Sequence, residues 1–284
     1  MSVPRSLGLA LSGGGARGLV HIGVLKALEA ADIPVGFLAG TSMGGVIAAA
    51  YAAGMSPTEM ERLALAHANL RSLWRVADPT LPRKGLFKGE QLEAFFKEYL
   101  GEKTFADLRI PLTLVAVDLN SGREIHLNRG CLAPAMRATL SIPGLLAPVE
   151  MDGMRLVDGG LLNNLPADVV RKMGADVVIG VDVYSDNTGS FWQHLSQKRL
   201  IANTIGDLIA TLGDALNLVV RAHSAYRLQQ NPPDFLLQPS VPPQVTVISG
   251  YDQAPQLIAL GEQAVQAILP TLREALAQPT LQKP

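Results

Sequence analysis

The chain has 284 residues, of which 48% are hydrophobic and 17% charged, so it can bury a sizeable core and lacks the composition of a disordered protein. Its formal net charge of −1 predicts no general attraction to nucleic acid or to an anionic membrane. One cysteine (Cys131) and five scattered histidines exclude a disulfide framework and a recognisable zinc site, so we expect no metal and no cofactor.

The first apolar run, at residues 7–11, ends at a series of glycines. It is too short for the apolar core of a signal peptide and far too short to span a membrane. The apolar segment at residues 200–220 is interrupted by two asparagines and two aspartates. We therefore expect a cytoplasmic protein, with peripheral contact at the inner face of the membrane left open.

Strands and helices alternate along the chain in the order typical of an α/β fold with a mainly parallel central sheet. The apolar runs predict strands at residues 7–11, 35–39, 112–117, 124–127, 154–157, 177–183 and 245–248. The helical periodicity predicts helices at residues 18–30, 43–53, 57–68, 91–100, 132–138, 166–173, 200–222 and 254–277. The sequence holds neither an internal repeat nor a long linker, so we expect one domain over residues 1–284.

Residues 13–18, Gly-Gly-Gly-Ala-Arg-Gly, form a glycine-rich turn between the first predicted strand and helix. Backbone N–H groups in such a turn form a natural binding site for negative charge. Nucleotide binding is a rival interpretation, but the Walker-type lysine and the acidic residue expected after the second strand are both missing. Within this turn, Arg17 either attracts an anionic headgroup or braces the loop.

Residues 40–44, Gly-Thr-Ser-Met-Gly, form a G-x-S-x-G motif between an apolar run and a predicted helix. In that context the serine occupies a tight strand-to-helix turn that the flanking glycines permit. We therefore expect Ser42 to be a nucleophile, with the N–H of Met43 pointing toward its reaction centre. A nucleophile beside an anion-stabilising loop is typical of acyl transfer.

A serine nucleophile needs a neighbouring base. The α/β-hydrolase order calls for a late histidine at a strand end, but His223 lies in a predicted helix and His194 in a polar loop. His21 is interpreted as a core or loop-bracing residue. Asp158 is the candidate base, because it ends a predicted strand and two glycines follow it. Asp118 also ends a strand, but turn chemistry explains it.

Three motifs in this order resemble the patatin-like phospholipase family: residues 13–18, residues 40–44, and Asp-Gly-Gly-Leu-Leu-Asn-Asn-Leu-Pro at residues 158–166. The chain is most similar to the bacterial branch related to the catalytic domain of neuropathy target esterase. Residues 138–143 are similar to that branch as well, with Ala-Thr where the family has Ala-Ser. The resemblance covers about residues 7–183.

The resemblance implies a patatin-like, three-layer α/β/α fold with a catalytic core at about residues 7–183 and a helical extension at about residues 186–284. It also implies that Ser42 and Asp158 form a catalytic dyad without histidine. The oxyanion hole it implies is formed by the glycine loop, with the N–H of Met43 added on the motif argument above: Gly13, Gly14, Gly15 and Met43.

The reaction that the resemblance implies is hydrolysis of an acyl ester of a lipid or lysophospholipid through an acyl-enzyme. Two alternatives stay open. An acyltransferase would use the same dyad with an alcohol in place of water, and a regulatory lipid-binding protein would keep the fold with little turnover. The acyl group, headgroup and physiological substrate are not predicted.

Two segments could extend the function beyond the catalytic residues. Residues 71–88 mix basic and apolar side chains, and Trp74 and Phe87 suit either a membrane contact or lid, or a solvated loop with a few anchors. The helix at residues 200–222 carries an apolar stripe, which we interpret first as a core face and second as a subunit interface. Homo-oligomer formation therefore stays open.

Overall fold

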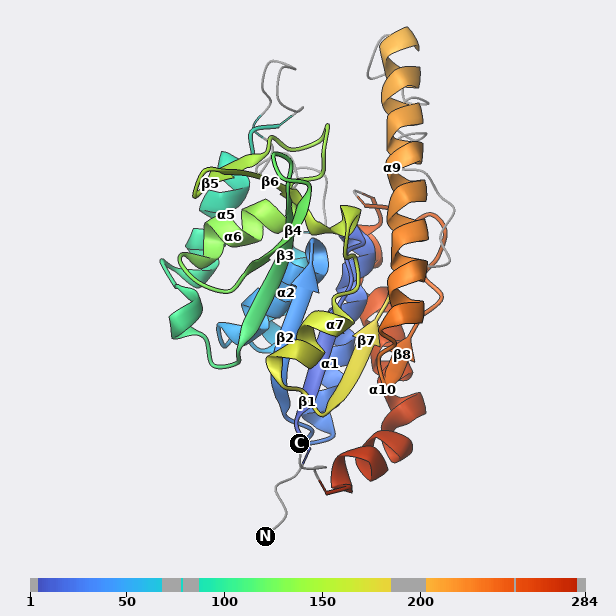
Figure 1. The fold of residues 1–284 in the computed structure, drawn as a ribbon. Helices are drawn as coiled ribbons and strands as arrows, with labels where there is room; N and C mark the ends of the chain where they lie inside the picture. Colours follow the sequence, from blue (N-terminus) through green and yellow to red (C-terminus); the bar gives the residue numbers. More distant parts are fainter. Residues whose placement is uncertain (1–4, 68–77, 79–86, 185–202, 248, 280–284) are drawn as a thin grey trace.

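The computed structural model describes residues 5–67, 78, 87–184, 203–247 and 249–279. Its central element is a twisted sheet of eight strands with helices on both sides (Figure 1). The strands are β1 Leu7–Leu11, β2 Val35–Thr41, β3 Leu112–Asp118, β4 Arg123–Leu127, β5 Val149–Met151, β6 Met154–Asp158, β7 Val177–Val181 and β8 Phe235–Leu237.

Each of the eight helices that the periodicity predicts is present among the described residues, with ends that differ by a few residues except at the C-terminal end of the longest one, which extends from the predicted residue 222 to Gln230. They are α1 Val20–Ala30, α2 Met43–Ala52, α3 Pro57–Ala66, α5 Glu90–Leu100, α6 Leu132–Thr139, α7 Ala167–Met173, α9 Asn203–Gln230 and α10 Ala254–Ala277. Four short 3₁₀ turns join them: η1 Gly15–Leu19, η2 Phe105–Asp107, η3 Gly159–Leu161 and η4 Tyr251–Gln253.

The sheet is mixed and mostly parallel, as predicted, with strand order β5-β6-β3-β2-β1-β7-β8 and β4 paired to β3. Strands β1, β2, β3, β7 and β8 run parallel to their neighbours in this group. The pairs β3–β4, β3–β6 and β5–β6 are antiparallel. Because β1 and β2 lie side by side and parallel, the glycine turn after β1 and the G-x-S-x-G turn after β2 meet at one edge of the sheet.

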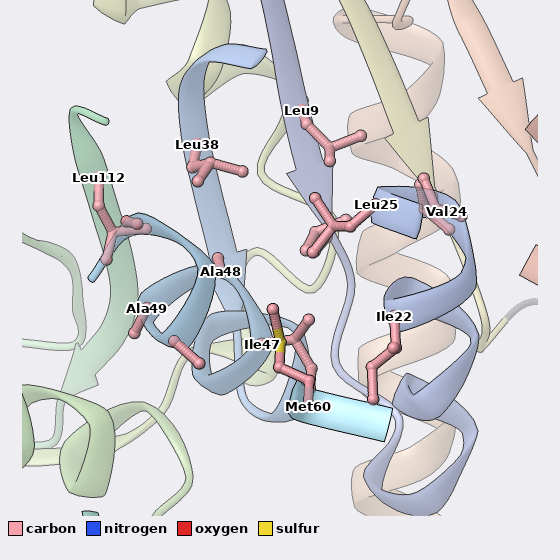
Figure 2. Close-up of a cluster of buried hydrophobic side chains, with 14 of the residues drawn as sticks. Leu9, Ile22, Val24, Leu25, Leu38, Ile47, Ala48, Ala49, Met60 and Leu112 are labelled. Atoms are coloured by element: carbon pink, nitrogen blue, oxygen red, sulfur yellow. The ribbon is translucent and has the colours of Figure 1, made fainter. Parts of the chain in front are cut away.

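Alternate residues of the central strands face two separate hydrophobic clusters. On one face, Leu9 and Leu38 pack with side chains of α1 and α2, and Figure 2 shows Leu25 and Ile47 on these helices beside the strands. On the other face, small residues such as Ala10 and Ala39 pack against α7. This alternation, with helices on both faces, gives the three-layer α/β/α arrangement.

The C-terminal part differs most from the predicted elements. Residues 245–247 are not a strand, because their backbone folds as a loop against the glycine turn and Ala16 donates to the Thr246 carbonyl (3.2 Å). The strand that extends the sheet beyond β7 is β8, a three-residue segment near Pro233 that the apolar pattern did not reveal. Strand β5, equally short, was missed for the same reason.

Helix α9 is longer than predicted and runs along one side of the molecule (Figure 1). The predicted apolar stripe does not lie wholly in the core, since Leu212 is 57% exposed and Val219 51% exposed. Within the described residues, no helix is both long and apolar enough to cross a membrane.

Helices α1 and α10 pack so closely that glycine is needed where they meet. A Cβ on Gly23 would lie 1.8 Å from the Ile258 carbonyl oxygen, and one on Gly261 would lie 2.0 Å from the Val20 carbonyl oxygen. Since α1 follows the glycine turn directly, this contact helps to fix the position of that turn.

We expect Gly23→Ala to lower the free energy of unfolding by at least about 1 kcal/mol, because overpacking outweighs the better helix propensity of alanine. Urea unfolding measures the effect. Gly36→Ala is the control, since the nearest atom to its Cβ would be the Leu7 carbonyl oxygen at an ordinary 3.4 Å. Equal stability of Gly23→Ala and the parent protein would contradict the close-packing argument.

Candidate active site

Ser42 lies in the turn between β2 and α2 with a strained backbone. Its φ of 53° and ψ of −127° are rare for a residue with a side chain. The residue is buried, and it immediately precedes the N-terminus of α2, whose first N–H groups have no intrahelical acceptor. The arrangement is that of a nucleophile elbow, in which the turn holds the serine at the edge of the sheet.

The two glycines of the motif are required by close backbone contacts. A Cβ on Gly40 would lie 2.6 Å from the Gly44 carbonyl oxygen, across the turn itself. A Cβ on Gly44 would lie 2.4 Å from the Leu11 carbonyl oxygen, at the end of β1. The motif therefore brings α2 against the end of β1, and with it Ser42 against the glycine turn.

Strand β3 brings Asp158 to Ser42. Its residue Val115 pairs with Thr41, which precedes the serine, and the next residue, Ala116, pairs with Asp158. Gly159 completes the approach, because a Cβ there would lie 2.4 Å from the Val115 carbonyl oxygen. Ser42 and Asp158, which are 116 positions apart in the sequence, are thus brought together because their strands pair with adjacent residues of β3.

The Asp158 carboxyl group has the electrostatics of a weak base. Burial raises its pKa from 3.8 to about 6, against the opposing effect of hydrogen bonds from the Ser42 side chain and the Gly160 N–H. The Gly160 bond to Oδ1 is 2.8 Å long. A carboxylate with a pKa near neutrality accepts a proton from a hydroxyl more readily than an ordinary aspartate does.

The backbone of the elbow is held by Thr139, at the end of α6. The Ser42 N–H donates to Thr139 Oγ1 (2.9 Å), and the Thr139 hydroxyl donates to the Val115 carbonyl (2.6 Å). This bond links the elbow to β3, the strand that also pairs with Asp158. Threonine at this position, in place of the family's serine, keeps a hydroxyl available.

The glycine turn lies directly beside the serine. A Cβ on Gly13 would lie 3.0 Å from the Ser42 Cβ. The Gly13 N–H donates to the Asn164 carbonyl (3.2 Å), so that donor is already engaged. Within the described residues, the N–H groups of Gly14 and Gly15 have no hydrogen-bond acceptor, and Gly15 has a φ of +60° that favours glycine.

Arg17 is buried beneath the glycine turn. Its Nε donates to the Val245 carbonyl (3.1 Å), and its guanidinium lies 5.6 Å from the centre of the Tyr184 ring. Burial lowers the Arg17 pKa. These contacts connect the glycine turn to the loop at residues 245–247, and the choice between loop bracing and headgroup attraction by Arg17 stays a prediction.

The other aspartate and histidines weighed in the sequence analysis have different surroundings from Asp158. Asp118 accepts from the Ser121 hydroxyl (2.7 Å) and the Arg155 N–H (2.9 Å), which lower its pKa to about 2 and organise the turn after β3. His21 is buried, with a pKa lowered to about 4 by burial, and its Nε2 bonds the Ser12 carbonyl (2.8 Å). His223 lies on α9, and His194 falls outside the described residues.

Of the two residues predicted to contact lipid, only Phe87 lies among the described residues. Trp74 and most of the segment at 71–88 lie outside the described residues. Phe87 is half-buried, and its backbone pairs with the loop after α6, donating to the Leu145 carbonyl (3.0 Å) and accepting from the Ala147 N–H (2.9 Å).

Met43, whose N–H is a predicted member of the oxyanion hole, is the first residue of α2, and its side chain packs close to Gly18.

Four residues at the site were not singled out as functional by the sequence analysis: Thr139, Asn163, Asn164 and Tyr184. Their role is to position other groups, and hydroxyl and amide side chains in a loop give no periodic signal. Asn163 and Asn164 are buried, unlike ordinary turn residues, and their place in the motif at residues 158–166 is the sequence signal that could have singled them out. Among the described residues, no cluster of His, Cys, Asp or Glu is placed to hold a metal ion.

We expect Thr139→Val to lower the free energy of unfolding by about 1–3 kcal/mol, because it leaves the Ser42 N–H and the Val115 carbonyl buried without their partner. Thr139→Ser keeps the hydroxyl and should lose far less. Urea denaturation of the three proteins makes the comparison. If valine and serine destabilise equally, lost packing rather than the hydrogen bonds explains the effect.

Comparison with known proteins places this chain in a family. The model for patatin-like phospholipase matches residues 9–171. An uncharacterized NTE family protein of Mycobacterium tuberculosis is 37% identical over 190 residues, which cover 66% of this chain and 51% of the relative. Human patatin-like phospholipase domain-containing protein 6 is 38% identical over 210 residues, 69% of this chain and 15% of the relative.

The chain therefore spans about half the length of the mycobacterial relative and a small part of the human one. Lysophospholipase nte1 of Aspergillus fumigatus is 34% identical over 200 residues, 66% of this chain and 13% of the relative. Among solved structures, VipD from Legionella pneumophila covers 95% of this chain and 68% of its own, with a TM-score of 0.54 and 15% identity, which supports the fold alone.

The stretch that the family model matches contains the glycine turn, the serine elbow and the Asp158 turn, and it is more than half of the chain. Its sequence relatives include NTE family proteins. This chain belongs to the patatin-like phospholipase family.

Proposed function

We propose that this protein is a serine hydrolase that cleaves acyl esters of lipids or lysophospholipids through a Ser42–Asp158 dyad. The observations that carry the proposal are the strained elbow of Ser42 and the buried Asp158 carboxyl group, whose pKa burial raises to about 6 against the opposing effect of the Ser42 side chain. Family membership supports a lipid ester as the substrate class. The name of the fungal relative, a lysophospholipase, is in line with it.

In the proposed reaction, the Asp158 carboxylate takes the Ser42 proton as the oxygen attacks the acyl carbonyl. The tetrahedral oxyanion is held by backbone N–H groups, and Gly14 and Gly15 are better candidates than Gly13 because the Gly13 N–H already bonds Asn164. Met43 adds a donor at the start of α2. The protonated Asp158 gives its proton to the leaving alcohol, and the same carboxylate then activates the water that hydrolyses the acyl-enzyme.

We expect a fluorophosphonate probe to label the parent protein covalently, and Ser42→Ala to lose the label completely. Asp158→Asn keeps the shape and the hydrogen bond to Gly160 but removes the base, so its labelling rate should fall by about 10²–10⁴-fold. Gel fluorescence against time measures the rates. Labelling of Ser42→Ala at the parent rate would refute the proposal.

The labelling rate should also depend on pH with the pKa of Asp158. Because the base must be ionised, the rate should be constant above about pH 7 and fall as pH drops through about 6, reaching about one tenth of the plateau near pH 5. Asp158→Asn should show no such inflection. A parent profile that is flat from pH 5 to 8, in protein shown by circular dichroism to be folded, would exclude Asp158 as the base.

A further inference from the structure

A partly buried polar cluster joins α9 to the loop after Asp158. At its centre is Asn163, whose Nδ2 donates to Glu124 Oε1 (2.9 Å) on β4 and to Asp168 Oδ1 (3.0 Å) on α7. The guanidinium of Arg227, on α9, spans the same two carboxylates, with Nη1 2.9 Å from Glu124 Oε2 and Nη2 2.9 Å from Asp168 Oδ2. One arginine and one amide thus share two carboxylates.

The amide of Asn163 can take only one orientation in this cluster. Both carboxylates are hydrogen-bond acceptors, so the Asn163 nitrogen must face them and its oxygen must face away. In this orientation Asn163 Oδ1 is buried without a partner within the described residues, a cost that accompanies the two bonds from Nδ2. The cluster therefore fixes the Asn163 side chain, and with it the backbone on either side.

The backbone of Asn163 contacts both halves of the proposed dyad. Its carbonyl accepts from the Thr41 hydroxyl (2.7 Å), one residue before Ser42, and its N–H donates to the Gly159 carbonyl (2.9 Å), one residue after Asp158. Helix α9 itself packs against η3, the turn that begins at Gly159. A displacement of Asn163 would therefore move both catalytic side chains relative to each other.

Arg227 supplies the charge that keeps this cluster together. Two carboxylates on one amide repel each other unless a cation lies between them. Hydrogen bonds from Lys172 and Arg227 outweigh burial and lower the Asp168 pKa to about 2. The Glu124 pKa is lowered by hydrogen bonds from His126 and Asn163 and by the charge of Arg227. Of the two carboxylates, Lys172 contacts only Asp168, and His126, whose Nε2 lies 2.7 Å from Glu124 Oε1, contacts only Glu124, so neither bridges the pair as Arg227 does.

We propose that Arg227 is a positioning residue for the Ser42–Asp158 dyad, acting through Glu124, Asp168 and Asn163, so that the docking of α9 determines the geometry of the active site. The proposal rests on the proposed function for its kinetic consequence. Its structural consequence, that Arg227 holds the loop at residues 159–164, stands independently and is tested separately.

The kinetic experiment compares Arg227→Met with Arg227→Lys on a soluble p-nitrophenyl ester. Loss of the bridge should lower kcat by about tenfold or more while KM changes by less than about threefold, because misplaced groups weaken the chemical step more than binding. Lysine restores the charge but cannot contact both carboxylates with two separate nitrogens, so the kcat of Arg227→Lys should lie between those of Arg227→Met and the parent protein. Unchanged kcat in folded Arg227→Met would overturn the proposal, as would a change in KM alone.

Arg171→Met is the matched control. Arg171, on α7, also ties this region to the segment after α9, with Nη2 3.0 Å from Asp234 Oδ2, but on the surface and without contact to Asn163. We expect its kcat to stay within about twofold of the parent. An equal loss of kcat in Arg171→Met and Arg227→Met would mean that any loosening of α7 suffices, and would overturn a specific role for Arg227.

Hydrogen exchange separates this proposal from the proposed function. In Arg227→Met and Arg227→Lys, backbone amides at residues 159–164 should exchange faster than in the parent and in Arg171→Met, whether or not the protein hydrolyses esters. If the parent is not labelled by fluorophosphonate but exchange still accelerates, the proposed function fails and the positioning role stands. If exchange at residues 159–164 is unchanged in both Arg227 variants, the positioning role fails even in an active enzyme.

Discussion

The arrangement of the site depends on the backbone of two adjacent residues, Asn163 and Asn164. The Asn163 carbonyl accepts from Thr41, and its N–H donates to Gly159, while the Asn164 carbonyl accepts from Gly13. These three bonds join the serine elbow, the aspartate turn and the glycine turn, which come from three distant parts of the chain. A parallel sheet brings strand ends to one edge but does not fix the loops there, so the loops need such a link.

Burial of the Asp158 carboxyl group in this site lowers the stability of the fold when the group is ionised. Its folded pKa of about 6 exceeds the ordinary value of 3.8, so the protonated form is the one the fold favours. The resulting stability is present below about pH 4 and is lost as pH rises through about 6, by up to about 3 kcal/mol for a shift of about two units. At neutral pH the fold therefore holds an ionised carboxylate that it would hold more easily as the acid. Groups strained in this way are typical of catalytic rather than structural positions.

The sequence was sufficient for the features that depend on local chemistry. Alternating apolar runs with glycine turns predict β1 and β2 and the helices after them, and the G-x-S-x-G motif predicts the turn at Ser42, whose φ of 53° and close Gly40–Gly44 contact are observed. The sequence was insufficient where contacts between distant parts of the chain determine the local structure. Residues 245–247 have the composition of a strand, but their carbonyls serve the glycine turn and the edge of β7 is taken by β8 instead. The roles of Ser42 and Asp158 in catalysis stay predictions.

The part of the chain beyond β7 is where the resemblance to the family was weakest, yet it completes the surroundings of the glycine turn. Arg17 reaches the Val245 carbonyl, and the Tyr184 ring lies over Arg17 while its hydroxyl bonds Asn217 on α9. Together with Arg227, these contacts tie α9 to the surroundings of the glycine turn and to the loop after Asp158. The exposed apolar side chains of α9, Leu212 and Val219 among them, lie on the same helix as Arg227, so the helix that we propose positions the catalytic loop also carries an apolar surface.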